Sequence, residues 1–271
     1  MADDYLLGDS DPELARLREQ HAVWREVTQD GWCVAGLQEG DRVLDVGSGP
    51  GFTTRELSDR VGPAGRVVAL DPSERFSRHL EARAAQEQRD NIAVCTQAIE
   101  DYAPEDGIGF DLIHVRWVLC FLPDPGSALA RLARLLKPGG RLVTLDYFNY
   151  HAFALAPRID TMATVVQAVH DSWSQSGGSL EVQGETPANC AAAGLALTNV
   201  AQVSGIARPG DPRFDWPEDF LRGYVPRLVE AGLLTEETGE AFLRDWAQRK
   251  AEPGTFLYRP PLLRVIARRP D

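Results

Sequence analysis

The stretch "VLDVGSGPGF" at residues 43–52 decides how the rest of the chain is interpreted. Its apolar run gives way to three glycines at alternate positions, Gly47, Gly49 and Gly51. Glycine lets the backbone pass close to a ligand and adopt a positive φ without steric cost. The dinucleotide fingerprint G-x-G-x-x-G would place a glycine where Phe52 stands. The pattern therefore predicts a nucleotide-type ligand over a strand-to-helix turn, with a spacing that departs from that fingerprint.

Length and charge limit the classes of protein that the chain can belong to. Its 271 residues suit one large α/β domain, or a core domain with a small cap. The formal net charge is −12, from 28 basic and 40 acidic residues. Such a surface repels phosphate backbones, so we expect no nucleic-acid partner.

The cysteines and the hydropathy indicate an intracellular protein. The four cysteines have neither C-x-x-C nor zinc-ligand spacing, so we expect reduced thiols and no metal; they are Cys33, Cys95, Cys120 and Cys190. No apolar run approaches the roughly 18 residues of a membrane span, and the N-terminus is acidic, unlike a signal peptide. We expect a cytoplasmic protein without a membrane partner, as a monomer or homodimer.

Short apolar strands alternate with helical patterns from residue 36 to residue 146. This alternation predicts a parallel sheet with helices on both faces, and ligands bind beyond the carboxyl ends of such strands. The predicted strands are 42–46, 66–70, 91–96, 110–115 and 141–146, and the helices are 52–61, 73–88 and one from 124 that "KPGG" stops.

The ends of the chain depart from that alternation. A helix is predicted at 10–35, and the later pattern reads as a helix at 150–175, a short helix at 186–194, a strand at 195–205, two helices within 217–250 and a strand at 261–269. We expect an N-terminal helical cap segment (1–35), a Rossmann-like core (36–146) and a remainder (147–271). Insertions at 147–180 and 208–256 would form a lid over a seven-stranded, mostly parallel sheet.

Several predicted strands end in residues suited to a nucleoside. Asp71 lies 24 residues after Gly47, where a carboxylate can accept hydrogen bonds from both ribose hydroxyls. "QAIED" (97–101) follows the third strand, and "VRWVL" (115–119) follows the fourth. The set resembles the small-molecule branch of the class I S-adenosylmethionine-dependent methyltransferases, through "VLDVGSGPG", "VVALDPS", "FDLIHVRWVLCFLPDP" and "LLKPGGRLV".

The resemblance implies S-adenosylmethionine as cofactor. This ligand carries no phosphate, which agrees with the absence of lysine from residues 40–60. The family often has an acidic residue where Ala98 or Ile99 stands, so the adenine amine would be held by Glu100, by backbone or by water. The implied cofactor-binding residues are Tyr5, Gln20, Asp45, Gly47, Ser48, Gly49, Asp71, Pro72, Phe76, Ala98, Ile99, Glu100, Val115 and Arg116.

Methyl transfer to a small acceptor needs little side-chain chemistry beyond removal of one proton. The candidate bases are Tyr147, His151 and His21, although His21 also suits a packed core position. Aromatic residues outside the core segment suit an apolar or aromatic acceptor, although Trp173 and Trp216 equally suit a hydrophobic core. The sequence does not choose among O-, N- and C-methylation.

Two other functions stay open at this point. An NAD-dependent oxidoreductase is favoured by Asp71 and the parallel sheet, and is opposed by Phe52 and by "LKPGG". A non-catalytic cofactor-binding protein of the same fold is the second alternative. Separate thermal-shift measurements with S-adenosylmethionine and with NAD would distinguish a methyltransferase from the oxidoreductase.

Overall fold

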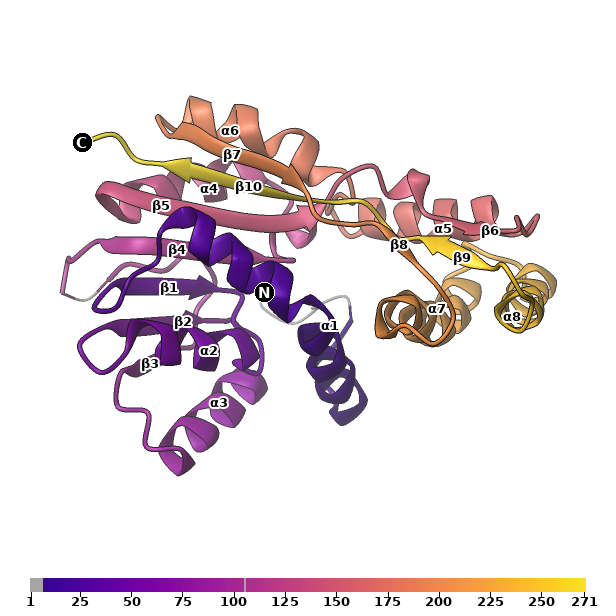
Figure 1. Cartoon of the computed structure of the whole chain (residues 1–271), viewed down its shortest axis with the longest axis horizontal. Helices are drawn as coiled ribbons and strands as arrows, with labels where there is room; N and C mark the ends of the chain where they lie inside the picture. The colour runs from indigo at the N-terminus through magenta and orange to yellow at the C-terminus, as the bar shows by residue number, and fades with distance from the viewer. Residues whose placement is uncertain (1–6, 105) are drawn as a thin grey trace.

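A computed structural model describes residues 7–104 and 106–271, which leaves Tyr5 outside the described residues. In the described part of the chain, a seven-stranded sheet runs in the order β3-β2-β1-β4-β5-β10-β7 (Figure 1). The first five strands pair in parallel, and β10 is antiparallel to both of its neighbours. The bounds are β1 Arg42–Val46, β2 Arg66–Leu70, β3 Ile92–Cys95, β4 Phe110–Arg116, β5 Leu136–Tyr147, β7 Ala196–Gln202 and β10 Leu262–Arg268. The predicted fold class is confirmed.

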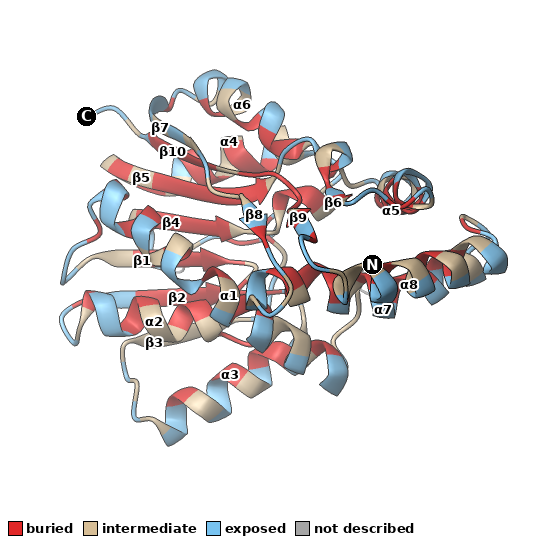
Figure 2. Ribbon diagram, turned by 45° about the vertical axis from the view of Figure 1, so that its right-hand side comes forward, coloured by how far each residue is buried: buried red, intermediate tan, exposed pale blue. Residues whose placement is uncertain are grey.

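Alternate residues of the central strands face two separate layers of helices. Val43 of β1 packs in one cluster with Trp32 and Leu57, whereas its neighbour Leu44 packs in another with Leu129. Figure 2 shows these central strands as largely buried. The helices around this sheet are α1 Asp11–Ala35, α2 Phe52–Val61, α3 Glu74–Gln86, α4 Pro125–Leu135 and α6 Thr186–Ala192.

Helix α1 begins as its sequence predicts, and it buries polar as well as apolar side chains. The Ser10 hydroxyl accepts a hydrogen bond from the Glu13 amide, and a proline lies in the first turn. Trp32 at its far end donates to Nδ1 of His114 in β4 at 3.2 Å, which fixes the helix on the sheet. The buried side chains include the polar Gln20 and His21, so α1 contributes to a polar site as well as to the core.

A second, smaller group of elements lies beyond the carboxyl ends of the parallel strands (Figure 1). It contains a three-stranded antiparallel sheet in the order β6-β9-β8 and three helices. We call this group the cap. Its elements are β6 Ala154–Ala156, α5 Met162–Gln175, β8 Ile206–Ala207, α7 Pro212–Glu230, α8 Glu236–Lys250 and β9 Phe256–Tyr258.

The prediction of one helix over 150–175 is wrong. A short 3₁₀ helix, η2 (Tyr150–Ala152), and strand β6 precede α5, which begins at Met162. Strand β6 forms because it pairs with β9, about a hundred residues later, and local periodicity carries no sign of that pairing. The "KPGG" segment was expected as a turn before the fifth strand, but β5 already begins at Leu136 and includes it.

The described residues contain no helix that is both long and apolar enough to cross a membrane.

Candidate active site

The three glycines of the turn after β1 have different surroundings. All have positive φ: 63° at Gly47, 52° at Gly49 and 81° at Gly51. A Cβ on Gly47 would lie 2.2 Å from the Val118 side chain, and one on Gly51 would lie 2.2 Å from Leu80. A Cβ on Gly49 would meet nothing within 4 Å. The outer two glycines therefore permit close packing, while Gly49 leaves open space for a ligand.

That open space belongs to a cavity of about 940 Å³ along the carboxyl ends of β1, β2 and β4. The order of the sheet reverses between β1 and β4, which is where ligands bind in such folds. Val115 does not line it: this β4 side chain is 1% exposed and packs in the core. We call this space the cofactor cavity, because most of the predicted cofactor-binding residues line it. They are Gln20, Asp45, Gly47, Ser48, Gly49, Asp71, Pro72, Phe76, Ala98, Ile99, Glu100 and Arg116.

Asp71 is held in place by the backbone on either side of the cavity. Its Oδ2 accepts from the Gly49 amide at 2.7 Å, and its Oδ1 accepts from the Ser73 amide at 2.9 Å. Burial raises the pKa of this carboxyl, and the two backbone donors oppose that shift. A carboxylate has about four acceptor sites, so a fixed Asp71 still has capacity for the two hydroxyls of a ribose.

Asp45 lines the same cavity from β1, one strand away from Asp71. Its Oδ2 accepts from the Thr54 hydroxyl at 2.6 Å. Burial raises the pKa of Asp45 to about 7, against the effects of the Thr54 hydrogen bond and the Arg116 charge. A cationic amino group in the cavity would favour the carboxylate, so Asp45 is suited to receive one.

Arg116 is a partly buried cation supported by α1. Its guanidinium donates to the Thr28 hydroxyl at 2.9 Å and lies 3.3 Å from Nδ1 of His21. Burial lowers the pKa of Arg116 to about 10, a value at which it remains charged near neutral pH. Because Arg116 lines the cofactor cavity, it is placed to receive the carboxylate of an amino-acid ligand.

His21 belongs to this support and does not line the cofactor cavity. Its Nδ1 faces the guanidinium of Arg116, so it acts as acceptor, and its Nε2 lies 3.2 Å from Glu56 Oε1. Burial lowers the pKa of His21. These contacts let His21 position Arg116 and hold His21 outside both ligand spaces.

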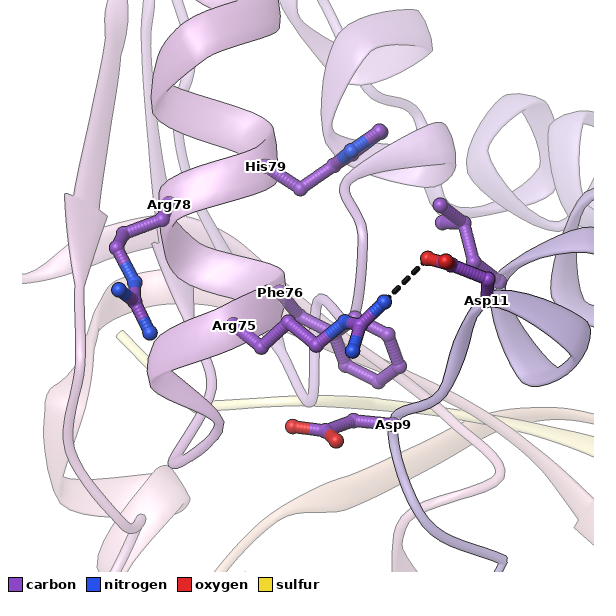
Figure 3. Close-up of a pocket in the computed structure, with 7 residues that line it drawn as sticks. Asp9, Asp11, Arg75, Phe76, Arg78 and His79 are labelled. Atoms are coloured by element: carbon purple, nitrogen blue, oxygen red, sulfur yellow. Dashed lines mark hydrogen bonds and ion pairs between the residues drawn. The ribbon is translucent and has the colours of Figure 1, made fainter.

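Gly8 and Asp9, just before α1, line the cofactor cavity, and the start of α1 is fastened to the start of α3. The Ser73 hydroxyl donates to Asp9 at 2.9 Å, and Arg75 forms an ion pair with Asp11. Figure 3 shows this pair beside the ring of Phe76, in a shallow cavity that adjoins the cofactor cavity. Gly8 and Asp9 therefore border the same cavity as Asp71 and Phe76.

A second pocket adjoins the cofactor cavity and shares Gln20, Trp117 and Phe121 with it. Its free volume is only about 30 Å³, roughly one water molecule, so a larger ligand requires the side chains or the cap to move. We call it the aromatic pocket. Its aromatic lining includes Trp117, Phe121, Tyr147, Tyr150, Trp216 and Phe220.

Trp117 stands at the junction of the two spaces in an unusual conformation. Its φ is 51°, a left-handed value that is rare for a bulky residue and often marks a functional site. Its amide donates to the Leu145 carbonyl at 3.0 Å, which holds the strained backbone. Its indole Nε1 is buried and makes no hydrogen bond to any residue the structure describes.

The three predicted bases are separated by the structure. Tyr147 lines the aromatic pocket, and burial raises the pKa of its hydroxyl well above the usual value. His151 lines neither the aromatic pocket nor the cofactor cavity; its ring contacts Glu181 and Gln167 instead. Of the three predicted bases, only Tyr147 therefore lines one of the two spaces.

Sequence reasoning missed Trp117 and Phe121 as site residues, whereas Trp216 was among the aromatic residues considered for an acceptor. Trp117 and Phe121 follow β4 directly, in a segment whose strand-end position was a usable signal. Trp216 comes from α7, and its Nε1 donates to Oε1 of Gln20 at 3.0 Å. Nothing in its local sequence distinguishes it from a core tryptophan.

Comparison with known proteins agrees with this geometry. The methyltransferase-domain family profile matches residues 43–140. The chain is 28% identical to the "Ubiquinone/menaquinone biosynthesis C-methyltransferase UbiE" of Saccharophagus degradans, over 68% of this chain and 78% of that protein. It is 34% identical to the "Demethylmenaquinone methyltransferase" of Lactococcus lactis, over 47% of this chain and 49% of that protein.

The solved structure of geranyl diphosphate methyltransferase has the same fold, with a TM-score of 0.58 and 17% identity over 99% of this chain and 93% of that one. The chain is a class I S-adenosylmethionine-dependent methyltransferase, and S-adenosylmethionine is its cofactor. These matches favour methyl transfer over the oxidoreductase alternative. The chain spans only about half to two thirds of several further quinone methyltransferase relatives, from 55% to 66% of their length.

Proposed function

We propose that the protein methylates a planar, hydroxylated aromatic molecule that binds in the aromatic pocket. The observation that carries this proposal is the composition of the pocket wall, in which indole, phenol and phenyl rings come from β5, α7 and the segment after β4. Aromatic side chains favour flat, apolar ligands through offset and edge contacts. The two spaces share Gln20, Trp117 and Phe121, so a ring bound in the aromatic pocket would lie next to a methyl donor bound in the cofactor cavity.

The unpaired indole N–H of Trp117 supports an oxygen on the acceptor. A buried donor without a partner is costly, and a ligand oxygen would remove that cost. Since Trp117 lines both spaces, an oxygen bonded there would lie close to the reacting atom. We infer that Trp117 orients a hydroxyl or carbonyl of the acceptor.

The lining of the aromatic pocket also limits the proton chemistry. Among the described residues it contains neither a carboxylate nor an imidazole, and Tyr147 is a neutral hydroxyl. The acceptor must therefore be electron-rich itself, as a phenol or hydroquinone ring is. When bound, the cofactor supplies an already activated methyl group, so the pocket has mainly to align the acceptor and exclude water.

The relatives favour carbon as the receiving atom, because one is a C-methyltransferase of ubiquinone and menaquinone biosynthesis and the other is a demethylmenaquinone methyltransferase. We therefore propose a ring carbon next to a hydroxyl. Oxygen is the alternative atom, and analysis of the product distinguishes the two.

The test is an acceptor screen with S-adenosylmethionine. Reduced naphthoquinones and substituted phenols are compared with aliphatic amines and carboxylic acids, and release of S-adenosylhomocysteine is measured. Activity confined to the hydroxylated rings, with mass and NMR spectra placing the methyl group on carbon, supports the proposal. Activity confined to the aliphatic compounds contradicts it.

We further propose the division at residues 36 and 147, with the core binding the cofactor and the cap recognising the acceptor. The net charge of −12 supports a small-molecule partner over nucleic acid. A cytoplasmic location and a monomer or homodimer complete the proposal. Light scattering after size-exclusion chromatography tests the oligomeric state.

A further inference from the structure

Three side chains with metal-ligand chemistry meet outside both ligand spaces. They are His151 in η2, His170 in α5 and Glu181 just before the 3₁₀ helix η3 (Val182–Gly184). One potential ligand atom from each lies within 4.8 Å of the others. The two imidazole rings are 4.7 Å apart between centroids. The three residues are not close together in sequence. The prediction of no metal rested on the spacing of the cysteines, and none of these three residues is a cysteine.

The hydrogen bonds of His151 fix which of its nitrogens carries a proton. The Gln167 amide donates from Nε2 to Asp171 Oδ1 at 2.7 Å, which turns its oxygen towards His151. The Oε1 atom of Gln167 lies 3.1 Å from Nε2 of His151, so Nε2 of His151 is the donor. In the neutral ring, Nδ1 therefore presents a lone pair to Glu181 Oε1, 3.4 Å away. A cation between the two lone pairs removes their repulsion.

The separation of those atoms fits a tetrahedral metal. Zinc bonds of about 2.1 Å to nitrogen and oxygen place neighbouring ligand atoms about 3.4 Å apart, as Nδ1 of His151 and Oε1 of Glu181 are. A metal-bound histidine usually donates its other N–H to a nearby oxygen, as His151 does to Gln167.

The second imidazole is also available. Nδ1 of His170 is buried and makes no hydrogen bond within the described residues, and the Asp171 carboxylate lies 4.0 Å from it. Two imidazoles and one carboxylate form a ligand set typical of zinc, with solvent as the fourth ligand. We propose that His151, His170 and Glu181 bind a divalent zinc-type metal ion.

Such an ion would join the cap to the aromatic pocket. Glu181 already accepts from the backbone amides of Asn149 at 2.9 Å and Tyr150 at 3.1 Å. Tyr150 lines the aromatic pocket. A metal that ties Glu181 to α5 through His170 therefore stabilises the turn that carries one wall of that pocket.

The test uses the full chain after treatment with a chelator. Cys33 is exposed, so a Cys33→Ser background removes a competing thiol. Titration calorimetry with ZnCl₂ is expected to give one ion per chain, with binding at least tenfold weaker in His170→Ala and in Glu181→Gln. His79→Ala, on α3, is the matched control and should bind as the background does. Gln167→Ala should weaken binding about tenfold, as loss of an outer hydrogen bond does.

Cobalt(II) gives a second measurement that does not depend on activity. Tetrahedral cobalt produces intense visible absorption, which we expect in the background chain and not in His170→Ala. A folded background chain that takes up no zinc, or site variants that bind as tightly as the background, would overturn the proposal. The His151–Glu181 contact would then be an imidazolium–carboxylate ion pair only.

Discussion

The cofactor cavity and the aromatic pocket meet at Trp117, yet they are built in different ways. The cofactor cavity is open, at about 940 Å³, and lies over turns at the ends of successive strands. The aromatic pocket is nearly closed, at about 30 Å³, and its side chains come from α1, β5, the cap and the segment after β4. Backbone turns on a rigid sheet give a preformed site, whereas side chains on separate elements can rearrange. The fold therefore places a preformed cavity beside an adaptable pocket, which suits the proposed binding of cofactor in the first and acceptor in the second.

The largest expected effect distinguishes packing from ligand space within the glycine turn. In Gly47→Ala, positive-φ strain of about 1–2 kcal/mol adds to overpacking against stiff Val118 of about 1–3 kcal/mol. Gly49→Ala has only the strain and should lose about 1–2 kcal/mol of unfolding free energy. Urea denaturation measures both. Equal losses in the two variants would show that the open space at Gly49 has no structural meaning.

A smaller effect is expected from the carboxylate that fixes the ribose end of the cofactor cavity. Asp71→Ala removes charge-assisted hydrogen bonds, so S-adenosylmethionine should bind about 1–3 kcal/mol more weakly. Titration calorimetry measures this change, with the exposed Asp90→Ala as control. Unchanged affinity in Asp71→Ala would remove Asp71 from the site.

Tyr147 tests whether the aromatic pocket acts on the acceptor alone. In Tyr147→Phe the acceptor loses one expected hydrogen bond to the Tyr147 hydroxyl, worth about 0.5–1.5 kcal/mol. Turnover should therefore fall about three- to tenfold. The dissociation constant of S-adenosylmethionine should not change. His151→Ala, assayed with a chelator present, should change neither quantity, because His151 lines neither space. Lower turnover in His151→Ala together with unchanged turnover in Tyr147→Phe would instead place the acceptor near η2.

The smallest effect is a pH dependence confined to the cofactor cavity. Burial raises the pKa of Asp45 to about 7, so the ligand-free chain holds a proton there at pH 6. Binding of a cationic amino group favours the carboxylate and releases that proton, so affinity should rise with pH. With a pKa of about 7 in the free chain and a carboxylate in the complex, the affinity should increase up to about eightfold between pH 6 and 7.5. Calorimetry at both pH values should find no such increase in Asp45→Asn.

The sequence was informative wherever neighbouring residues build the structure. The glycine turn, Asp71 and the segment after β3 each follow a strand directly, so their positions along the sheet edge could be predicted. The pairing of β6 with β9 joins residues about a hundred positions apart and has no local pattern. The contact of Trp216 with Gln20 is of the same kind, because it depends on how α7 docks on α1.

Single side chains were also hard to assign by residue type. His21 and His151 were predicted as bases because histidine titrates near neutral pH. The structure gives His21 a guanidinium and a carboxylate as neighbours, and gives His151 an amide and a carboxylate. These neighbours come from other elements, so the role of each imidazole depends on tertiary packing.

The tryptophans at the junction have a consequence for spectroscopy. Trp24, Trp117 and Trp216 form a triad with ring centroids 5.1–5.7 Å apart, and two of its contacts are edge-to-face. Indoles this close exchange excitation energy, so their emission reports on the triad as a unit. Trp117 and Trp216 line the aromatic pocket, while Trp24 lines neither that pocket nor the cofactor cavity. Acceptor binding should therefore alter the intrinsic fluorescence and near-ultraviolet circular dichroism of the protein, which gives ligand searches a signal that requires neither label nor turnover.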